Sequence, residues 1–105
     1  MKIKNNFKQN SYSKEIAEKY IDSNSSFMML STEAEEMYTF EDNKRVATGS
    51  KIWVLQAGIN PFYVKLPAQA NVNAKQLDQI KLIELEAIEV RNNIYFRATS
   101  IEKIK

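Results

Sequence analysis

The sequence predicts a mainly β protein: a five-stranded antiparallel barrel with a short helix between its third and fourth strands and a helical extension at the N-terminus. Segments along residues 27–104 alternate apolar with polar side chains at the two-residue period of a half-buried strand. Turn-forming Asn, Asp, Gly and Pro residues separate these segments. A helix-capping pattern follows the third barrel strand. At 105 residues, the chain is long enough for one domain with one core.

The N-terminal part is predicted to form an arm followed by a short helix. Residues 1–12 are rich in Lys, Asn and Ser and show little periodicity, which indicates a loose arm. Ser13 can cap a helix that reaches about Ile21, and the polar run at 22–26 then ends it. We therefore divide the chain into an N-terminal arm with a short helix, residues 1–25, and a barrel domain, residues 26–105.

Strand patterns follow along the rest of the chain. A short buried strand is expected at 27–30, and longer strands at 37–41, 50–57, 62–66, 81–90 and 94–104. Turns are expected at 42–45, 58–61 and 91–93, and Asn tolerates the positive φ that hairpin turns need. Residues 31–36 are compatible with a helical turn, a polar loop or a bulged strand.

One helix is expected within the barrel domain. Asn73 can cap a short helix over 73–80, in which Leu77 and Ile80 would face inward. Three strands, a helix and two strands is the element order of the oligonucleotide/oligosaccharide-binding (OB) barrel, so we predict an OB-like barrel. An SH3-like barrel or an open antiparallel sheet would give a similar pattern.

Composition excludes several kinds of chemistry. The chain has no cysteine and no histidine, which removes disulfides, the usual zinc sites and imidazole catalysis. Its two glycines cannot form a glycine-rich phosphate loop. The carboxylates Glu84, Glu86 and Glu89 lack partners in sequence that would complete a metal site, so we expect a solvated strand face. We therefore predict that the protein is not an enzyme and has no cofactor.

Charge is unevenly distributed along the chain. Residues 1–42 carry five cations and eight anions, a net charge of −3, and residues 43–105 carry ten cations and five anions, a net charge of +5. Any site for a polyanion is therefore expected in the second part. No apolar run approaches the roughly 20 residues of a membrane span, and no signal-peptide core follows Met1. We expect a cytoplasmic protein that makes no membrane contact.

One arrangement recurs in three strands: an aromatic residue and a cation on one face, and apolar residues on the other. The strands are KIWVL (51–55), FYVKL (62–66) and IYFRA (94–98). Bases of unpaired nucleic acid stack on aromatic rings, while its phosphates lie beside cations. The candidate nucleic-acid-binding residues on these faces are Trp53, Tyr63, Tyr95, Lys51, Lys65 and Arg97.

Three further cations are candidates for phosphate contacts. Lys44 and Arg45 are expected in a turn near Lys51, and Arg91 in the last hairpin. Solvated turn residues are the alternative.

The aromatic residues also have an alternative interpretation. A register error of one residue would place Trp53 in the core, and Tyr63 and Tyr95 could be ordinary cross-strand packing residues. Tyr38 and Phe40 share a face of the strand at 37–41, and we expect one or both in the core.

The stretch TFEDNKRVATGSKIWVLQAGINPFYVKLP resembles a family of small proteins encoded on conjugative plasmids, integrative elements and phages of Gram-positive bacteria. The family shows an acidic-Asn/Gly-Lys-Arg turn, a Gly before a strand, and a strand ending in Val-Lys. The matching residues are Asp42, Lys44, Arg45, Gly49, Val64 and Lys65, with Tyr95 and Ala98 in the final strand. The resemblance spans roughly residues 38–104. It implies an OB fold and single-stranded-DNA binding, although some members are uncharacterised.

We therefore predict a non-catalytic single-stranded-DNA-binding protein that acts in the transfer or replication of plasmid, mobile-element or phage DNA. RNA binding stays open because stacking does not separate RNA from DNA. A protein–protein adaptor, which would dock through the helix carrying Ile16, Tyr20 and Ile21, is the other alternative; Trp53 would then be an interface or core residue. A homo-oligomer is also open, since exposed strand edges can pair.

Overall fold

The structure is a computed structural model, and it describes residues 11–104. The predicted loose arm therefore lies outside the described residues, apart from Ser11 and Tyr12. The described part contains one helix and eight strands and is mainly β, as expected. These elements are α1 (Lys14–Glu18), β1 (Phe27–Met29), β2 (Glu35–Glu41), β3 (Lys44–Gln56), β4 (Ile59–Leu66), β5 (Gln79–Ile83), β6 (Glu86–Val90), β7 (Asn93–Arg97) and β8 (Ser100–Lys103).

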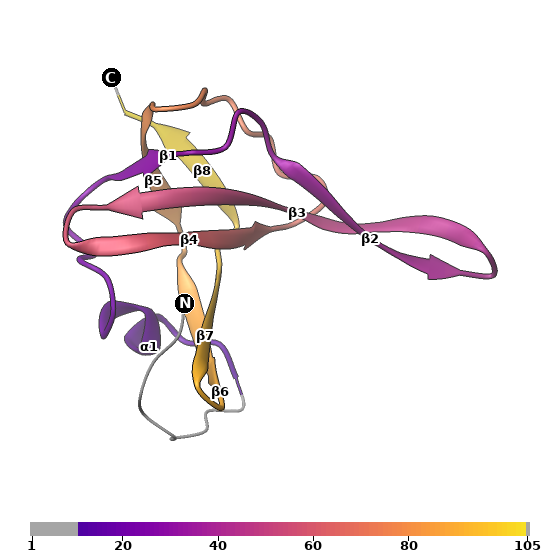
Figure 1. Ribbon diagram of the computed structural model, residues 1–105, viewed down its shortest axis with the longest axis horizontal. Helices are drawn as coiled ribbons and strands as arrows, with labels where there is room; N and C mark the ends of the chain where they lie inside the picture. Colours follow the sequence, from indigo (N-terminus) through magenta and orange to yellow (C-terminus); the bar gives the residue numbers. More distant parts are fainter. Residues whose placement is uncertain (1–10, 105) are drawn as a thin grey trace.

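The strands form one curled sheet in the order β6-β7-β4-β3-β1-β5-β8, and β2 pairs with β3 outside this path. All pairs are antiparallel except β4 with β7, which is parallel. The chain from β5 to β8 is one long hairpin whose turn lies between β6 and β7. Near the turn it pairs as β6·β7, at one end of the sheet order. Farther from the turn it pairs as β5·β8, at the other end. One bent hairpin therefore supplies both ends of the sheet and curls it into a half-barrel (Figure 1).

The predicted count of five barrel strands is wrong because the two long C-terminal strands are each broken. The strand expected at 81–90 stops at Ile83, and Glu84 takes a positive φ of 52° before β6 begins. The strand expected at 94–104 is broken at the same level, where the backbone N–H of Thr99 donates to the carbonyl of Ile83 at 2.9 Å. The buried positions change from Ile80 in β5 to Ala87 and Glu89 in β6, so the side chains that face inward change parity across the break.

The helix predicted over 73–80 is also wrong. This segment runs alongside β1, where the backbone N–H of Leu77 donates to the carbonyl of Met29 at 2.6 Å. The N–H of Met29 donates in turn to the carbonyl of Asp78 at 2.9 Å. A helix would have used these backbone groups internally. Leu77 has a positive φ of 74° and is 63% exposed, whereas Ile80 is buried in β5.

The N-terminal helix begins as predicted and ends earlier. The Ser13 hydroxyl accepts a hydrogen bond from the backbone N–H of Ile16 at 3.2 Å, which is N-cap geometry. Helix α1 ends at Glu18, and Ile21 follows it in a turn. Ile16 and Ile21 are buried in the same core cluster as the strands, so the helical segment packs on the body of the protein.

The turns are shorter than predicted. Asp42 and Asn43 alone link β2 to β3, and both have positive φ, as a type I′ hairpin turn requires. The four-residue turn expected at 42–45 is therefore wrong, and Lys44 and Arg45 begin β3. The other two hairpin turns also have two residues each: 57–58 before β4, and 91–92 before β7. Residues 35–36 belong to β2.

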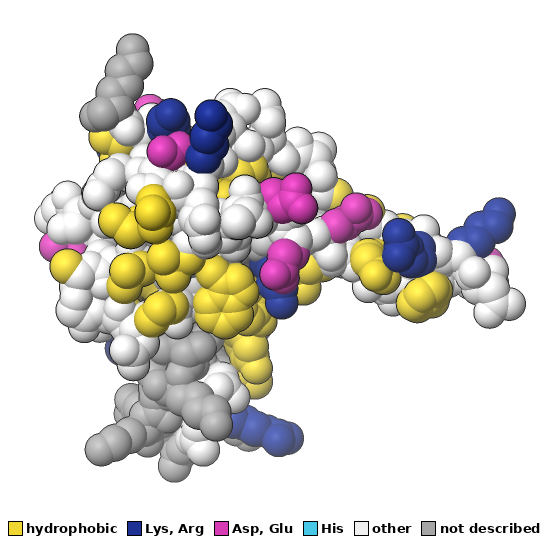
Figure 2. Space-filling model, turned by 45° about the horizontal axis from the view of Figure 1, so that its top comes forward, with side chains coloured by type: hydrophobic (Ala, Val, Ile, Leu, Met, Phe, Trp, Pro, Cys, Tyr) yellow, Lys and Arg dark blue, Asp and Glu magenta, His cyan; other side chains and the backbone are white. Residues whose placement is uncertain are grey.

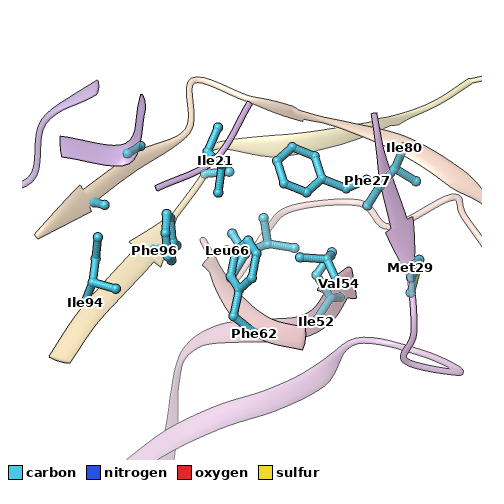
Figure 3. Close-up of a cluster of buried hydrophobic side chains, with 14 of the residues drawn as sticks. Ile21, Phe27, Met29, Ile52, Val54, Phe62, Leu66, Ile80, Ile94 and Phe96 are labelled. Atoms are coloured by element: carbon cyan, nitrogen blue, oxygen red, sulfur yellow. The ribbon is translucent and has the colours of Figure 1, made fainter. Parts of the chain in front are cut away.

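The core lies on the concave side of the sheet (Figure 3). Phe62 is at its centre, with its ring centroid 4.5 Å from that of Phe96 and 6.2 Å from that of Phe27. The inward faces predicted for three strands are confirmed by the burial of Ile52, Val54, Phe62, Val64, Leu66, Ile94, Phe96 and Ala98. No helix within residues 11–104 is long and apolar enough to cross a membrane.

Strand β2 and the first part of β3 form a two-stranded arm, residues 35–48, that projects from the body (Figure 1). Tyr38 is 44% exposed and Phe40 is 67% exposed, so the expectation that one or both lie in the core is wrong. Their rings contact each other edge to face, with centroids 6.2 Å apart. Beyond its base, none of residues 11–104 forms a second layer over the arm on which these rings could be buried.

Gly49 lies where the arm joins the body. A Cβ atom built on it would lie 2.5 Å from the carbonyl oxygen of Leu66, well inside van der Waals contact. The backbone of β3 therefore approaches the end of β4 more closely than any other residue would permit.

We expect Gly49→Ala to lower the free energy of unfolding by about 1–3 kcal/mol, since the added methyl group must displace backbone. Urea unfolding followed by Trp53 fluorescence measures this. Gly58→Asn is the matched control because a Cβ at Gly58 meets nothing within 4 Å and Asn tolerates its positive φ. Equal stability of Gly49→Ala and the wild type would contradict the close approach.

A buried carboxylate ties the helical segment to β6. Glu89 is 1% exposed and accepts hydrogen bonds from the Tyr20 hydroxyl at 2.6 Å and from Lys19 Nζ at 3.3 Å. The solvated face expected for Glu84, Glu86 and Glu89 is therefore wrong for Glu89. Burial, together with the hydrogen bond to Glu89 and its negative charge, raises the pKa of Tyr20 to about 12.

Tyr20→Phe should lower the free energy of unfolding by about 1–3 kcal/mol at pH 8, because Glu89 loses a buried hydrogen bond. The raised pKa of Tyr20 stabilises the fold fully below pH 10 and loses this effect as the pH rises through about 12. Urea titrations at pH 8, 10 and 11 should thus show a steeper loss in the wild type than in Tyr20→Phe. Tyr38→Phe, at an exposed tyrosine, is the control. Parallel pH dependence of Tyr20→Phe and wild type would overturn this role for Tyr20.

Candidate nucleic-acid interface

The outward face of β3, β4 and β7 carries a row of aromatic rings and a row of cations. The register pairs Trp53 with Tyr63, and two residues away along the strands it pairs Lys51 with Lys65. The parallel register pairs Lys65 with Arg97, which extends the cation row onto β7. Two residues along a strand span roughly 7 Å, so the two rows run side by side across three strands.

The aromatic row is accessible to solvent. Trp53 is 39% exposed and Tyr95 is 38% exposed, which places Trp53 on the outer face as predicted. The Trp53 and Tyr63 ring centroids are 5.6 Å apart with an interplanar angle of 65°, an edge-to-face contact rather than a stack. The pairing of Val64 with Phe96 puts Tyr95 beside Tyr63, one step earlier along both strands. The rings therefore follow one another across β3, β4 and β7.

The cation row is largely compensated by carboxylates. Lys51 Nζ lies 3.6 Å from Glu35 Oε2, and Arg97 Nη2 lies 2.9 Å from Glu86 Oε1. Lys65 has no ion pair with any of residues 11–104. The three cations and two carboxylates give this face a net charge of +1, much less than the charge distribution along the chain suggests. Sequence reasoning missed both carboxylates because their cross-strand partners depend on register.

The cations also contact aromatic rings. Lys51 Nζ lies 5.0 Å from the centroid of the Tyr63 ring, and the Arg97 guanidinium lies 4.0 Å from that of Tyr12. Such contacts hold a long side chain along the surface and leave its remaining donors available.

Tyr12 is a member of this face that sequence reasoning missed. Its neighbour Ser13 forms a β-bridge to Ala87, with backbone hydrogen bonds of 2.9 and 3.0 Å. This bridge holds Tyr12 against Arg97. Burial raises the pKa of the Tyr12 hydroxyl, the Arg97 charge opposes that rise, and Tyr63 and Tyr95 add to it. The one feature of the sequence that could have pointed to Tyr12 is its position directly before the capping residue Ser13.

The other three candidate cations lie away from the rows. Lys44 and Arg45 stand at the far end of the arm, at least six residues from Lys51, or roughly 20 Å along β3, so their expected place beside Lys51 is wrong. Arg45 lies 4.2 Å from the Tyr38 ring centroid. Arg91 lies in the β6–β7 turn, at the opposite end of β7 from Arg97. The arm has a net charge of −2, from the four carboxylates Glu35, Glu36, Glu41 and Asp42 and the two cations Lys44 and Arg45.

Figure 2 shows hydrophobic side chains gathered on the body near the base of the arm, with charged side chains beside them. A second group lies on the arm, next to Lys or Arg side chains. The exposed large apolar residues of the arm are Tyr38, Phe40 and Val46. Exposed aromatic rings next to cations therefore occur in two places, and those on the body are arranged in rows across three strands.

Comparison of the chain with protein-family models, with curated proteins and with solved structures finds no match. The resemblance to small DNA-binding proteins of mobile elements therefore stays a prediction, and the arguments that follow use the geometry of the described residues.

Proposed function

We propose that the protein binds single-stranded DNA without catalysis, through the outward face of β3, β4 and β7. The observation that supports this most is the pair of parallel rows: Trp53, Tyr63 and Tyr95 for bases, beside Lys51, Lys65 and Arg97 for phosphates. Successive bases of a single strand can stack on successive rings, while its backbone follows the cations. A duplex keeps its bases inside and offers no faces for stacking.

The strand order supports the same function. Strands β1 and β2 both pair with β3, so together they act as one interrupted strand. In the same way, β5 and β6 act as one bent strand, and β7 and β8 act as another. With these mergers the connections follow an OB-type path, although the described residues 67–78 between β4 and β5 form no helix. In OB barrels the face of the second and third strands binds oligonucleotides, and that face corresponds here to β3 and β4.

The carboxylates set the expected strength and salt dependence. A strand that contacts three cations should lose affinity with salt with a log–log slope of roughly −2, from about −0.7 per contact. Because Lys51 and Arg97 already have carboxylate partners, the phosphates compete with Glu35 and Glu86. We therefore propose moderate, weakly sequence-dependent binding as the basis for a role in the transfer or replication of mobile-element DNA. RNA stays an alternative because nothing in the rows requires a deoxyribose.

Titration with a thymine 15-mer should quench the fluorescence of Trp53, the only tryptophan in the chain, and salt should weaken the quenching. Trp53→Phe should retain binding measured by anisotropy of a labelled oligonucleotide, and Tyr95→Ala should weaken it about 5- to 100-fold through the loss of a stacked base. Val46→Ala, at an exposed apolar residue of the arm and five residues from Lys51 along β3, is the matched control. Equal binding of duplex and single strand, or no binding, would contradict the proposal. An RNA 15-mer of uracil tests the alternative.

Glu35→Gln should strengthen the binding of the thymine 15-mer about two- to fivefold at low salt, because it frees Lys51 from an exposed ion pair. Glu102→Gln removes one carboxylate from β8, at the other end of the sheet order, and should change affinity little. Anisotropy titrations at two salt concentrations measure both variants. An equal gain in the two variants would mean that only total charge matters, and would remove Lys51 from the phosphate site.

A further inference from the structure

A cleft opens at one end of the cation row, where the parallel strands β4 and β7 both end. Its volume is about 350 Å³. Leu66, Pro67 and Ala98 form its apolar lining, and its charged lining consists of Lys65, Arg97, Glu84 and Glu86. Tyr12 also lines it. A strand that follows the cation row therefore passes the mouth of this cleft, since Lys65 and Arg97 belong to both.

The size and charge of the cleft favour a flat polar ligand. Ligand pockets begin at about 300 Å³, so this cleft is large enough for one nucleobase and little more. Two cations and two carboxylates balance within the lining. A phosphate group would therefore meet as much repulsion as attraction. A neutral heterocycle with hydrogen-bond donors on its edge meets apolar walls and carboxylate acceptors.

Existing contacts hold the charged groups of the cleft in place. Arg97 Nε donates to Glu86 Oε1 at 3.0 Å while its guanidinium lies on the Tyr12 ring. The Thr99 hydroxyl lies 3.2 Å from Glu84 Oε1 and 3.2 Å from the carbonyl oxygen of Ile83, and its one proton can be donated to either acceptor. Each carboxylate thus has one oxygen engaged, and its Oε2 makes no hydrogen bond with any of residues 11–104. An ionised carboxylate can only accept hydrogen bonds, so these oxygens select ligands by their donors.

The four bases differ in the donors that they present on their Watson–Crick edge. Guanine presents two adjacent donors, its N1–H and N2 amino group. Cytosine and adenine each present one amino group beside a ring-nitrogen acceptor, and thymine presents one N–H between two carbonyl acceptors. A carboxylate oxygen attracts donors and repels acceptors, so the match falls in the order guanine, then cytosine and adenine, then thymine.

We propose that this cleft binds one guanine base, with Glu84 and Glu86 accepting hydrogen bonds from its N1–H and N2 amino group. This inference rests on the proposed function if the guanine is part of a single strand bound along the aromatic and cation rows. The cleft then adds a base preference at one position to a surface that otherwise accepts any sequence. The same chemistry would also take a free guanine nucleotide.

The test uses the full chain and thymine 15-mers with one central guanine, inosine, adenine, cytosine or thymine. We expect the guanine oligonucleotide to bind about five- to tenfold more tightly than all-thymine, the low end for a bidentate base contact because Glu84 and Glu86 are solvent-accessible. Inosine, which lacks the N2 amino group, should lose most of this gain. Glu84→Gln and Glu86→Gln should each reduce the guanine-to-thymine ratio, and Glu102→Gln should leave it unchanged. The guanine-to-thymine ratio is taken within each variant, so a change in affinity that is equal for all oligonucleotides cancels.

The outcomes separate the two proposals. Tight thymine binding with a guanine-to-thymine ratio near one overturns the guanine cleft and leaves the single-strand surface intact. If no oligonucleotide binds, the proposed function fails, and guanosine and thymidine monophosphates added to ¹⁵N-labelled protein decide the inference. Shifts of the Arg97 and Thr99 amides with the guanine nucleotide alone support a site for a free nucleotide. Equal shifts with both nucleotides, or none, overturn the cleft.

Discussion

The bent hairpin that supplies both ends of the curled sheet is the constraint on which the other features depend. The breaks at Glu84 and at residues 98–99 allow β5·β8 to pair at one end of the sheet and β6·β7 at the other. This bend brings β7 alongside β4 in parallel, so that Phe96 packs on Phe62 inside. The same strand pairing places Tyr95 and Arg97 beside Tyr63 and Lys65 outside. The core and the candidate site are therefore two faces of one pairing of strands, and neither can form without the other.

The parts of the fold that follow from local rules could be predicted from the sequence. The alternation in residues 51–55 and 62–66 assigns each side chain to a face without knowledge of any partner strand, because successive strand residues point in opposite directions. The inward placement of Ile52 and Val54, and the outward placement of Trp53, follow from it. The Ser13 cap is equally local. The cap uses only a backbone N–H three residues away.

The remaining features depend on contacts between residues far apart in the chain. The segment at 73–80 has a helix-like pattern, yet it forms hydrogen bonds with β1, more than 40 residues earlier. The breaks in the C-terminal strands depend on Thr99 reaching Ile83 across the hairpin. The carboxylates that oppose Lys51 and Arg97, and the position of Tyr12 on Arg97, require a register that no short sequence pattern encodes. Propensity is a weak guide where such tertiary hydrogen bonds are available.

The arm has a consequence for how the protein can evolve. Side chains beyond Gly49 on the arm contribute nothing to the buried core, so selection for folding acts on them only weakly. The constraints that remain are few: the glycine at the base and two turn residues that tolerate positive φ. Residues such as Tyr38, Phe40 and Val46 can therefore be exchanged over generations while the body keeps its shape. Descendants of one ancestral chain could acquire different partners through the arm and retain the same barrel-like body.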